Sequence, residues 1–296
     1  MRLGPAIAIT LLLCAGCDAG DGTGSGAAEY LSSYTWQEDA PWFGGLSGIE
    51  LSADGHRATL LSDRARLITA DLTRDADGRV VGAELTGQWP LRASTGQRLK
   101  GQAADSEGLA TGPDGQIYIS FEDIDRVARY ARPGAPARVL NDPRTFGDPP
   151  RNRSLEALAM DGAGRLYTLP ENAPDARGQI PVYRRDGQDW HIAFTLPPRG
   201  RFLPVGADFD PEGRLYVLER AVTLLGFRSR LRRWTLENDQ PVREETLLTT
   251  AAGRHDNLEG VAIWRDNAGR LRATLVSDDN FLRLQRTELV DYLLPD

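Results

Sequence analysis

The chain contains little cysteine: two residues among 296, Cys14 and Cys17, both close to the N-terminus. The rest of the chain can therefore form neither a disulfide framework nor a thiolate metal site. Histidine is also scarce, with three residues, and no two have the spacing of a zinc-binding helix motif. Runs of like charge are absent, and the formal net charge is −7. Both features argue against a nucleic-acid-binding surface.

No hydrophobic run is long enough to span a membrane permanently. The apolar stretch 6–13 follows Arg2 and precedes Cys14-Ala15-Gly16-Cys17, an arrangement typical of a secretory signal. These four residues resemble a lipobox, although Cys14 stands where leucine is usual. The resemblance implies cleavage before Cys17 and lipidation of the Cys17 sulfur, and an ordinary cleaved signal is the alternative.

The N-terminal region divides the chain into three parts. We predict a signal over residues 1–16, a flexible glycine-rich tether over 17–29 and one globular domain over 30–296. The protein is then expected in the cell envelope, periplasmic and lipid-anchored, and to contact the membrane through the anchor alone. We expect a monomer.

The domain repeats one pattern: a short strand, a turn such as Asp-Gly, a second strand rich in Leu, Tyr and Val, and then acidic residues. Successive copies lie 60, 49, 50 and 53 residues apart, counted at Gly48, Gly108, Ala157, Ala207 and Gly260. This spacing fits four-stranded blades and predicts an all-β fold, a β-propeller with five blades, or six if the long first interval contains another repeat. Residues Tyr30 to Trp36 are expected to supply the last outer strand and close the ring.

Polar side chains recur where the first strand of each copy starts and where the second ends, and antiparallel pairing brings both positions to one face. The starts carry Ser47, Glu107, Glu156, Asp208 and Glu259. The ends carry Asp63, Glu122, Glu171, Glu219, Asp278 and Asp279. Carboxylates crowded around a channel need a counter-cation, and oxygen ligands favour calcium or magnesium. Each carboxylate taken alone could instead cap a turn or pair with an arginine.

These positions suggest roles. The acidic residues at the second-strand ends are the expected metal ligands, and Glu107, Glu156 and Glu259 are the expected catalytic residues. Arg64, Arg220 and Asn280 are expected to bind an anionic substrate. His255, four residues before Glu259, is either a general base or a solvated loop histidine.

Several stretches resemble the bacterial phytase-like family, the "esterase-like activity of phytase" proteins. They are Asp-Ser-Glu-Gly-Leu-Ala at 105–110, Leu-Glu-Ala-Leu-Ala at 155–159, Leu-Glu-Arg at 218–220, and Asp-Asn-Leu-Glu-Gly-Val-Ala at 256–262 with Ser-Asp-Asp-Asn-Phe at 277–281. The resemblance runs from about Leu46 to Leu289. It implies an exported or anchored propeller that hydrolyses an ester or phosphoester in an acidic channel carrying calcium.

The domain lacks the Gly-x-Ser-x-Gly nucleophile elbow of serine hydrolases. The sequence therefore favours metal-assisted hydrolysis of a small anionic substrate. A non-catalytic propeller that binds a small ligand or an envelope protein on the same face is the alternative, because this fold hosts many functions.

Overall fold

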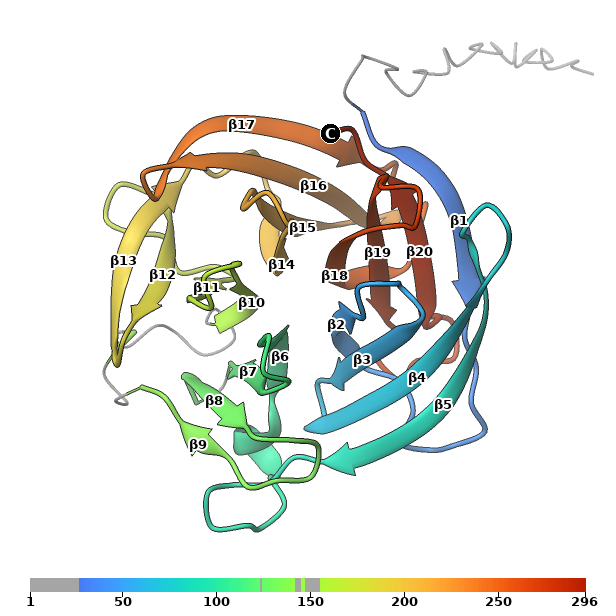
Figure 1. Ribbon diagram of the computed structural model, residues 1–296, viewed down its shortest axis with the longest axis horizontal. Coiled ribbons are helices and arrows are strands. Elements are labelled where there is room, and N and C mark those ends of the chain that lie inside the picture. Colours follow the sequence, from blue (N-terminus) through green and yellow to red (C-terminus); the bar gives the residue numbers. More distant parts are fainter. Residues whose placement is uncertain (1–26, 123, 142–144, 147–154) are drawn as a thin grey trace, which may run out of the picture.

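The structure is a computed structural model that describes residues 27–122, 124–141, 145–146 and 155–296. Five four-stranded antiparallel sheets surround a central axis (Figure 1). The predicted five-bladed β-propeller is thus confirmed. In the described part, the 3₁₀ turn η1 (Gly101–Ala104) is the one helical element, and no helix there is long and apolar enough to cross a membrane.

The strands follow the chain blade by blade, from the axis outward. Blade 1 contains β2 (Leu46–Leu51), β3 (Arg57–Ser62), β4 (Arg66–Arg74) and β5 (Val80–Pro90). Blade 2 contains β6 (Ser106–Thr111), β7 (Ile117–Phe121), β8 (Arg126–Tyr130) and β9 (Arg138–Val139). Blade 3 contains β10 (Leu155–Met160), β11 (Leu166–Pro170), β12 (Ile180–Asp186) and β13 (Asp189–Leu196). Blade 4 contains β14 (Leu203–Phe209), β15 (Leu215–Thr223), β16 (Gly226–Glu237) and β17 (Gln240–Thr249).

Blade 5 joins the two ends of the described chain. It contains β18 (Asn257–Arg265), β19 (Leu271–Asp278), β20 (Glu288–Leu293) and, as its outer strand, β1 (Glu29–Thr35). The register of β1 on β20 runs from Glu29 opposite Leu293 to Thr35 opposite Glu288. The predicted closure by an N-terminal strand is confirmed: β1 pairs with β20 and completes the four strands of blade 5 (Figure 1).

The extra length of the first repeat interval is a loop between blades 1 and 2 and not a sixth blade. Residues 91–105 connect blades 1 and 2 and include η1. Leu91 is buried in the hydrophobic cluster between these blades, and Leu99 packs against it. The predicted signal, Cys14, Cys17 and the tether up to residue 26 lie outside the described residues.

Glycines allow the innermost strands to meet at the axis. A Cβ atom on Gly108 would lie 2.4 Å from the Ser120 Oγ and 2.5 Å from the Glu156 carbonyl oxygen. A Cβ atom on Gly206 would lie 2.4 Å from the Glu259 carbonyl oxygen. Since these contacts are shorter than any ordinary Cβ contact, the glycines determine how closely neighbouring blades approach at the channel.

Candidate functional site

Every innermost strand has a β-bulge near its start. The register shifts between Leu46 and Gly48 in β2, and equivalent shifts interrupt β6, β10, β14 and β18. A bulge places an extra residue opposite its partner strand and redirects a side chain. The side chains at the bulges are those of Ser47, Glu107, Glu156, Val205 and Glu259.

The ends of the second strands lie beside these bulges. The Asp63 N–H donates to the Gly45 carbonyl at 2.8 Å, and the Glu122 N–H donates to the Asp105 carbonyl at 3.1 Å. In the last blade, Asp278 lies opposite Asn257. We call the resulting set the carboxylate ring: Asp63, Asp105, Glu107, Glu122, Glu156, Glu171, Glu259 and Asp278.

Blade 4 differs from the prediction in both of its inner strands. Arg220, and not Glu219, lies opposite Leu203 and occupies the position that Asp63, Glu122 and Asp278 hold in their blades. This copy has Val205 and no acidic residue at the bulge. For this reason the repeated pattern points to two other acids of the copy, Asp208 and Glu219. A slip of one residue turns a strand side chain to the opposite face.

Glu219 is therefore not part of the ring, which corrects its assignment as a metal ligand. Its carboxylate accepts hydrogen bonds from Arg230 Nε at 2.6 Å and Arg232 Nε at 2.9 Å, and it is fully buried. Asp208 is also misplaced by the prediction. It lies three residues beyond the bulge of β14 and accepts the Ile263 N–H at 2.6 Å.

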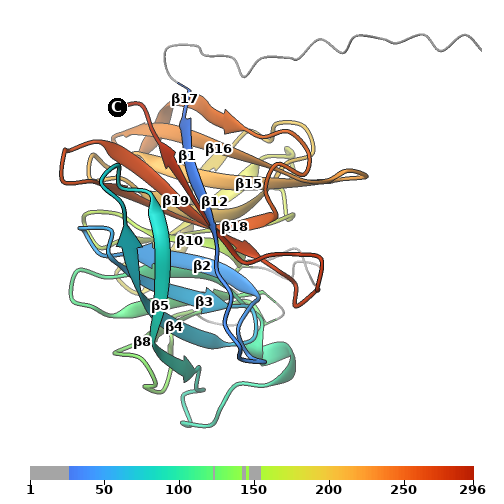
Figure 2. The same ribbon diagram turned by 90° about the vertical axis from the view of Figure 1, so that its right-hand side faces the viewer.

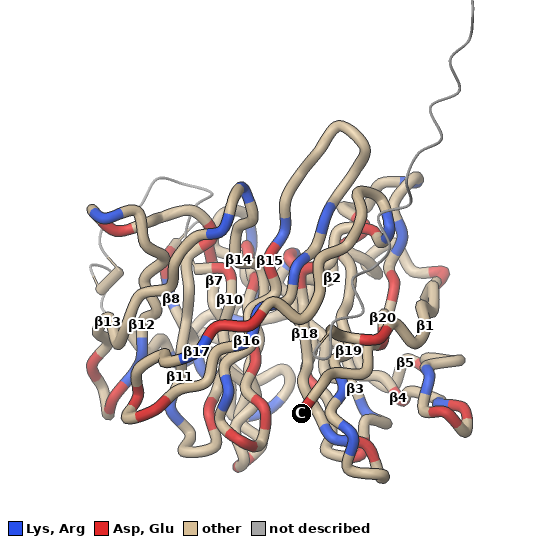
Figure 3. The backbone as a smooth tube through the Cα atoms, turned by 90° about the horizontal axis from the view of Figure 1, so that it is seen from above, with Lys and Arg blue, Asp and Glu red and all other residues tan. Residues whose placement is uncertain are grey.

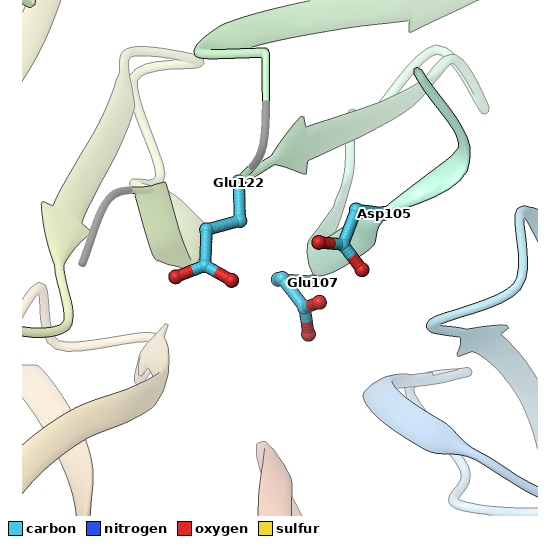
Figure 4. A group of neighbouring side chains, drawn as sticks. All are labelled: Asp105, Glu107 and Glu122. Atoms are coloured by element: carbon cyan, nitrogen blue, oxygen red, sulfur yellow. The ribbon is translucent and has the colours of Figure 1, made fainter. Parts of the chain in front are cut away.

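Two groups of carboxylates in the ring could hold a metal ion. Oxygens of Asp105, Glu107 and Glu122 lie within 4.8 Å of one another, and so do oxygens of Glu122, Glu156 and Glu171. Figure 4 shows the first group, with Asp105 and Glu107 at the start of β6 and Glu122 just after β7. Since both groups use Glu122, the ring offers two adjoining cation positions on the side of blades 2 and 3.

Burial dominates the electrostatics of the ring. It raises the pKa of Glu107 and of Glu156 well above the usual value, and neighbouring carboxylates raise both further. Burial also raises the pKa of Asp63 to about 7, of Asp278 to about 6 and of Glu259 to about 8. The main cause in all five groups is the loss of water around a charged carboxylate, and repulsion from neighbouring carboxylates adds to it. Both effects favour either a bound proton or a bound cation.

The expected substrate-binding residues lie in different surroundings. The Arg64 guanidinium is exposed and lies over the Phe281 ring, 3.3 Å from its centroid. The Arg220 guanidinium is instead paired with Glu171 and Glu259. The Asn280 side chain donates to the Gln285 Oε1 at 2.8 Å. Of the two arginines, only Arg64 is exposed to solvent.

Asp279 supports the loops beside the ring. Its Oδ1 accepts the N–H of Gly45 at 2.9 Å and that of Phe281 at 3.0 Å. The neighbouring Gly44 has a φ of 129°, and a Cβ atom there would lie 2.6 Å from the Asp279 Oδ1. The carboxylate thus fastens the end of β19 to the loop before β2.

Asp105 and Asn257 also belong to the site, although they are not among the residues predicted from the repeated pattern. Each stands two residues before a bulged glutamate, Glu107 or Glu259. The Asn257 Nδ2 donates to the Glu259 Oε1 at 2.8 Å. Aligning the copies on the Glu-Gly pair would have identified both positions.

His255 is not a solvated loop residue. Its side chain is buried, and its Nε2 lies 2.6 Å from the Tyr292 hydroxyl. The imidazole ring of His255 also packs against the Tyr30 side chain, with the two ring centroids 5.9 Å apart. Burial lowers the pKa of His255 to about 4, and Arg254 and Arg286 add to the effect.

Fold and site together define a five-bladed β-propeller with a ring of carboxylates at one mouth of its channel. Residues 41–281 match the family model described as "Phytase-like: Esterase-like activity of phytase". The chain therefore belongs to the phytase-like family, as its motifs predicted. The comparison with curated proteins returns no match.

Solved structures with a similar chain course are distant in sequence. The PQQ-bound aldose sugar dehydrogenase of Streptomyces coelicolor is 13% identical, with a TM-score of 0.45 over 88% of this chain and 98% of that chain. The gluconolactonase XC5397 of Xanthomonas campestris is 15% identical, with a TM-score of 0.44 over 83% and 72%. Virginiamycin B lyase of Staphylococcus aureus is 9% identical, with a TM-score of 0.40 over 89% and 98%. None of the three bears on the reaction of this chain.

Proposed function

We propose that this propeller hydrolyses a phosphoester or carboxylic ester whose polar group enters the carboxylate ring beside a divalent cation. The observation that carries the proposal concerns Glu107 and Glu156, which are 9% and 8% exposed. Within the described residues, neither carboxylate accepts a hydrogen bond from a donor side chain or backbone N–H. Buried carboxylates without donors are costly unless a cation balances them. The family description supports a hydrolytic reaction.

The donor set of the ring fits calcium. It consists of carboxylate oxygens, and Asp105, Glu107 and Glu122 bring theirs within 4.8 Å of one another. Calcium accepts six to eight oxygen ligands in flexible geometry, so protein carboxylates and water can share its coordination sphere. A bound cation of this kind neutralises charge that develops on the ester oxygens and lowers the pKa of bound water.

Glu259 is the proposed proton donor. Burial raises its pKa to about 8, against the opposing effect of Arg220. Arg220 and Asn257 both donate to the Oε1 atom, so a proton can be held on the Oε2 atom near neutral pH. A water oxygen bonds to the phosphorus or carbonyl carbon, and the bond to the leaving alcohol oxygen breaks. Glu259 gives its proton to that oxygen, and the proton released by the attacking water restores Glu259. Arg64 holds the anionic group of the substrate.

The reaction is tested with p-nitrophenyl phosphate and p-nitrophenyl acetate in calcium, magnesium or EDTA. We expect turnover of at least one ester that depends on a divalent cation. Glu259→Gln should lower kcat by about 100-fold or more while the melting temperature stays close to wild type. Turnover that is indifferent to EDTA contradicts the role of the cation, and unchanged kinetics in Glu259→Gln removes Glu259 from the mechanism.

Glu50→Gln is a matched control. Glu50 is a half-buried residue whose carboxyl group also has a raised pKa, for which desolvation is the main cause and Asp208 adds to it. It lies three residues beyond Ser47 on β2, away from the ring, and accepts the Thr111 N–H at 3.1 Å. We therefore expect Glu50→Gln to retain wild-type turnover.

Cation binding has its own test in thermal melting. A cation that binds the folded chain and not the unfolded one raises the melting temperature by mass action. We expect millimolar calcium to raise the melting temperature relative to EDTA. No shift with either calcium or magnesium would contradict the cation-loaded ring.

A binding role without catalysis is favoured by one other feature. The hairpin that joins β15 and β16 projects from the propeller (Figure 2) and carries no charged residue at its tip (Figure 3). Leu224 and Leu225 in this tip are fully or largely exposed. An absence of turnover in all cation conditions, together with a cation-induced melting shift, would favour this second function.

The location of the protein follows from the N-terminal sequence. We infer that the chain is exported and anchored in the cell envelope by a lipid on Cys17, since the apolar segment and Cys14-Ala15-Gly16-Cys17 support this reading. Cys17→Ser should move the protein from the membrane fraction to the soluble envelope fraction. An unchanged distribution would contradict the lipid anchor.

A further inference from the structure

Blade 4 is the exception in the carboxylate ring. At the bulge it has Val205 where blades 2, 3 and 5 have glutamate, and at the end of the second strand it has Arg220 where blades 1, 2 and 5 have a carboxylate. The position therefore contains a fixed positive charge in place of a negative one. Its side chain is 18% exposed, so the charge is largely withdrawn from solvent.

Three oxygen acceptors from the neighbouring blades converge on this guanidinium. Arg220 Nη2 donates to the Glu171 Oε1 at 2.8 Å. Arg220 Nη1 donates to the Asn257 Oδ1 at 2.9 Å and also to the Glu259 Oε1. These partners come from blade 3 on one side and blade 5 on the other. Carboxylate and amide oxygens arranged around one positive charge are also the ligand types of calcium.

Glu107 and Glu156, the bulge glutamates of blades 2 and 3, are not paired with Arg220 in the described part of the chain. Glu156 belongs to the same carboxylate group as Glu171, and within the described residues no donor reaches its carboxylate. Glu107 in the adjoining group is in the same situation. Arg220 thus neutralises the side of the ring between blades 3 and 5 and leaves the side of blades 2 and 3 for a bound cation.

We propose that Arg220 is a built-in counter-cation that fills one metal position of the ring, and that removing its guanidinium opens a calcium site formed by Glu171, Asn257 and Glu259. In wild type, calcium is then confined to the side of blades 2 and 3, where Glu107 and Glu156 lie. The inference rests on the proposed function in one respect, namely that the ring binds divalent cations. It assigns Arg220 a role in limiting the number of cations and not in binding substrate.

The test is a calcium titration by isothermal titration calorimetry on the purified full chain, freed of metal ions. Arg220→Gln is expected to bind one more calcium ion per chain than wild type. Arg64→Gln removes an exposed guanidinium on the same face and is expected to bind the wild-type number. The same number of ions in wild type and Arg220→Gln overturns the proposal.

Two further measurements keep the proposal testable if Arg220→Gln does not fold. Arg220→Lys keeps the positive charge and is expected to bind no additional ion. If Arg220→Gln unfolds in EDTA, calcium is expected to restore its circular dichroism spectrum, because the ion replaces the lost charge. A variant that remains unfolded in saturating calcium, while wild type is folded, overturns the proposal.

The two proposals fail in different ways. If wild type binds no calcium, the proposed function loses its cation, yet one ion gained by Arg220→Gln still supports the role of Arg220. If wild type binds calcium and Arg220→Gln gains none, the counter-cation role is wrong and the proposed function stands.

Discussion

Glu219 and Arg232 form a fully buried ion pair inside blade 4, with the Arg232 Nε 2.9 Å from the Glu219 Oε2. Arg230, two residues before Arg232 on the same face of β16, contacts the same carboxylate at 2.6 Å. Glu219 thus compensates two arginines that have little contact with water. Its role is to stabilise the blade, although the sequence places it next to ring residues.

This relationship predicts a loss of stability in Glu219→Gln. Removing one partner of a buried ion pair leaves uncompensated charge, which costs about 3 kcal/mol or more of unfolding free energy. Urea unfolding measures the loss. Glu212→Gln, whose side chain is 44% exposed and contacts Arg265, should change it by less than about 1 kcal/mol. Normal stability with weakened calcium binding in Glu219→Gln would instead return Glu219 to the ring.

The turns on the face opposite the ring predict a second stability effect. Asp210 accepts the Arg214 N–H at 2.9 Å, its Nε–H at 2.6 Å and the Tyr216 hydroxyl at 2.9 Å. Asp210→Ala leaves these donors without a partner and should cost about 2–4 kcal/mol in urea unfolding. Asp114→Ala in the equivalent exposed turn should cost less than about 1 kcal/mol. Equal losses in both variants would contradict this account.

Close packing at the channel predicts the outcome of adding one methyl group. Gly108→Ala would bring a Cβ atom within 2.5 Å of the Glu156 carbonyl, so β10 must shift. We expect a loss of about 2 kcal/mol or more, together with weaker calcium binding, because Glu107 and Glu156 move. Gly162→Ala, which meets nothing within 4 Å, should change stability by less than about 1 kcal/mol. Wild-type stability in Gly108→Ala would show that the blades can separate freely.

His255 predicts a defined response to acid. Its pKa is lowered to about 4, so between pH 6.5 and pH 4 the unfolded chain binds a proton that the folded chain does not. The contribution of His255 is fully present above pH 6.5 and is lost as the pH falls through this window, by at most about 3 kcal/mol. The groups facing it are Arg254, Arg286, Tyr30 and Tyr292.

The measurement compares the unfolding free energies of wild type and His255→Asn from pH 7 to pH 4. The difference between the two proteins should shrink as the pH falls, since the variant lacks the titrating group. His191→Asn is the control, because the His191 side chain is 45% exposed, and it should show the wild-type pH dependence. A difference that stays constant between pH 7 and pH 4 would contradict the role of His255.

The sequence by itself determined the architecture and seven of the eight residues of the carboxylate ring, all except Asp105. Repeated strands, turns and spacing identify the blades because each blade must bury two apolar faces with the same short pattern. The acids of blades 1, 2, 3 and 5 share one mouth for the same reason: Asp63, Glu122, Glu171 and Asp278 end equivalent strands. The N-terminal strand that closes the ring was also predictable, since the last copy is one strand short.

The tertiary structure alone decided what happens in blade 4. Its copy has no acid at the bulge, and a shift of one residue exchanges the inward and outward side chains of a strand. Glu219 therefore turns into the blade, and Arg220 turns to the channel. The partners of Arg220 are 49, 37 and 39 residues away in the chain, at Glu171, Asn257 and Glu259. These contacts depend on how blades 3, 4 and 5 pack around the axis, and a local sequence pattern cannot predict that packing.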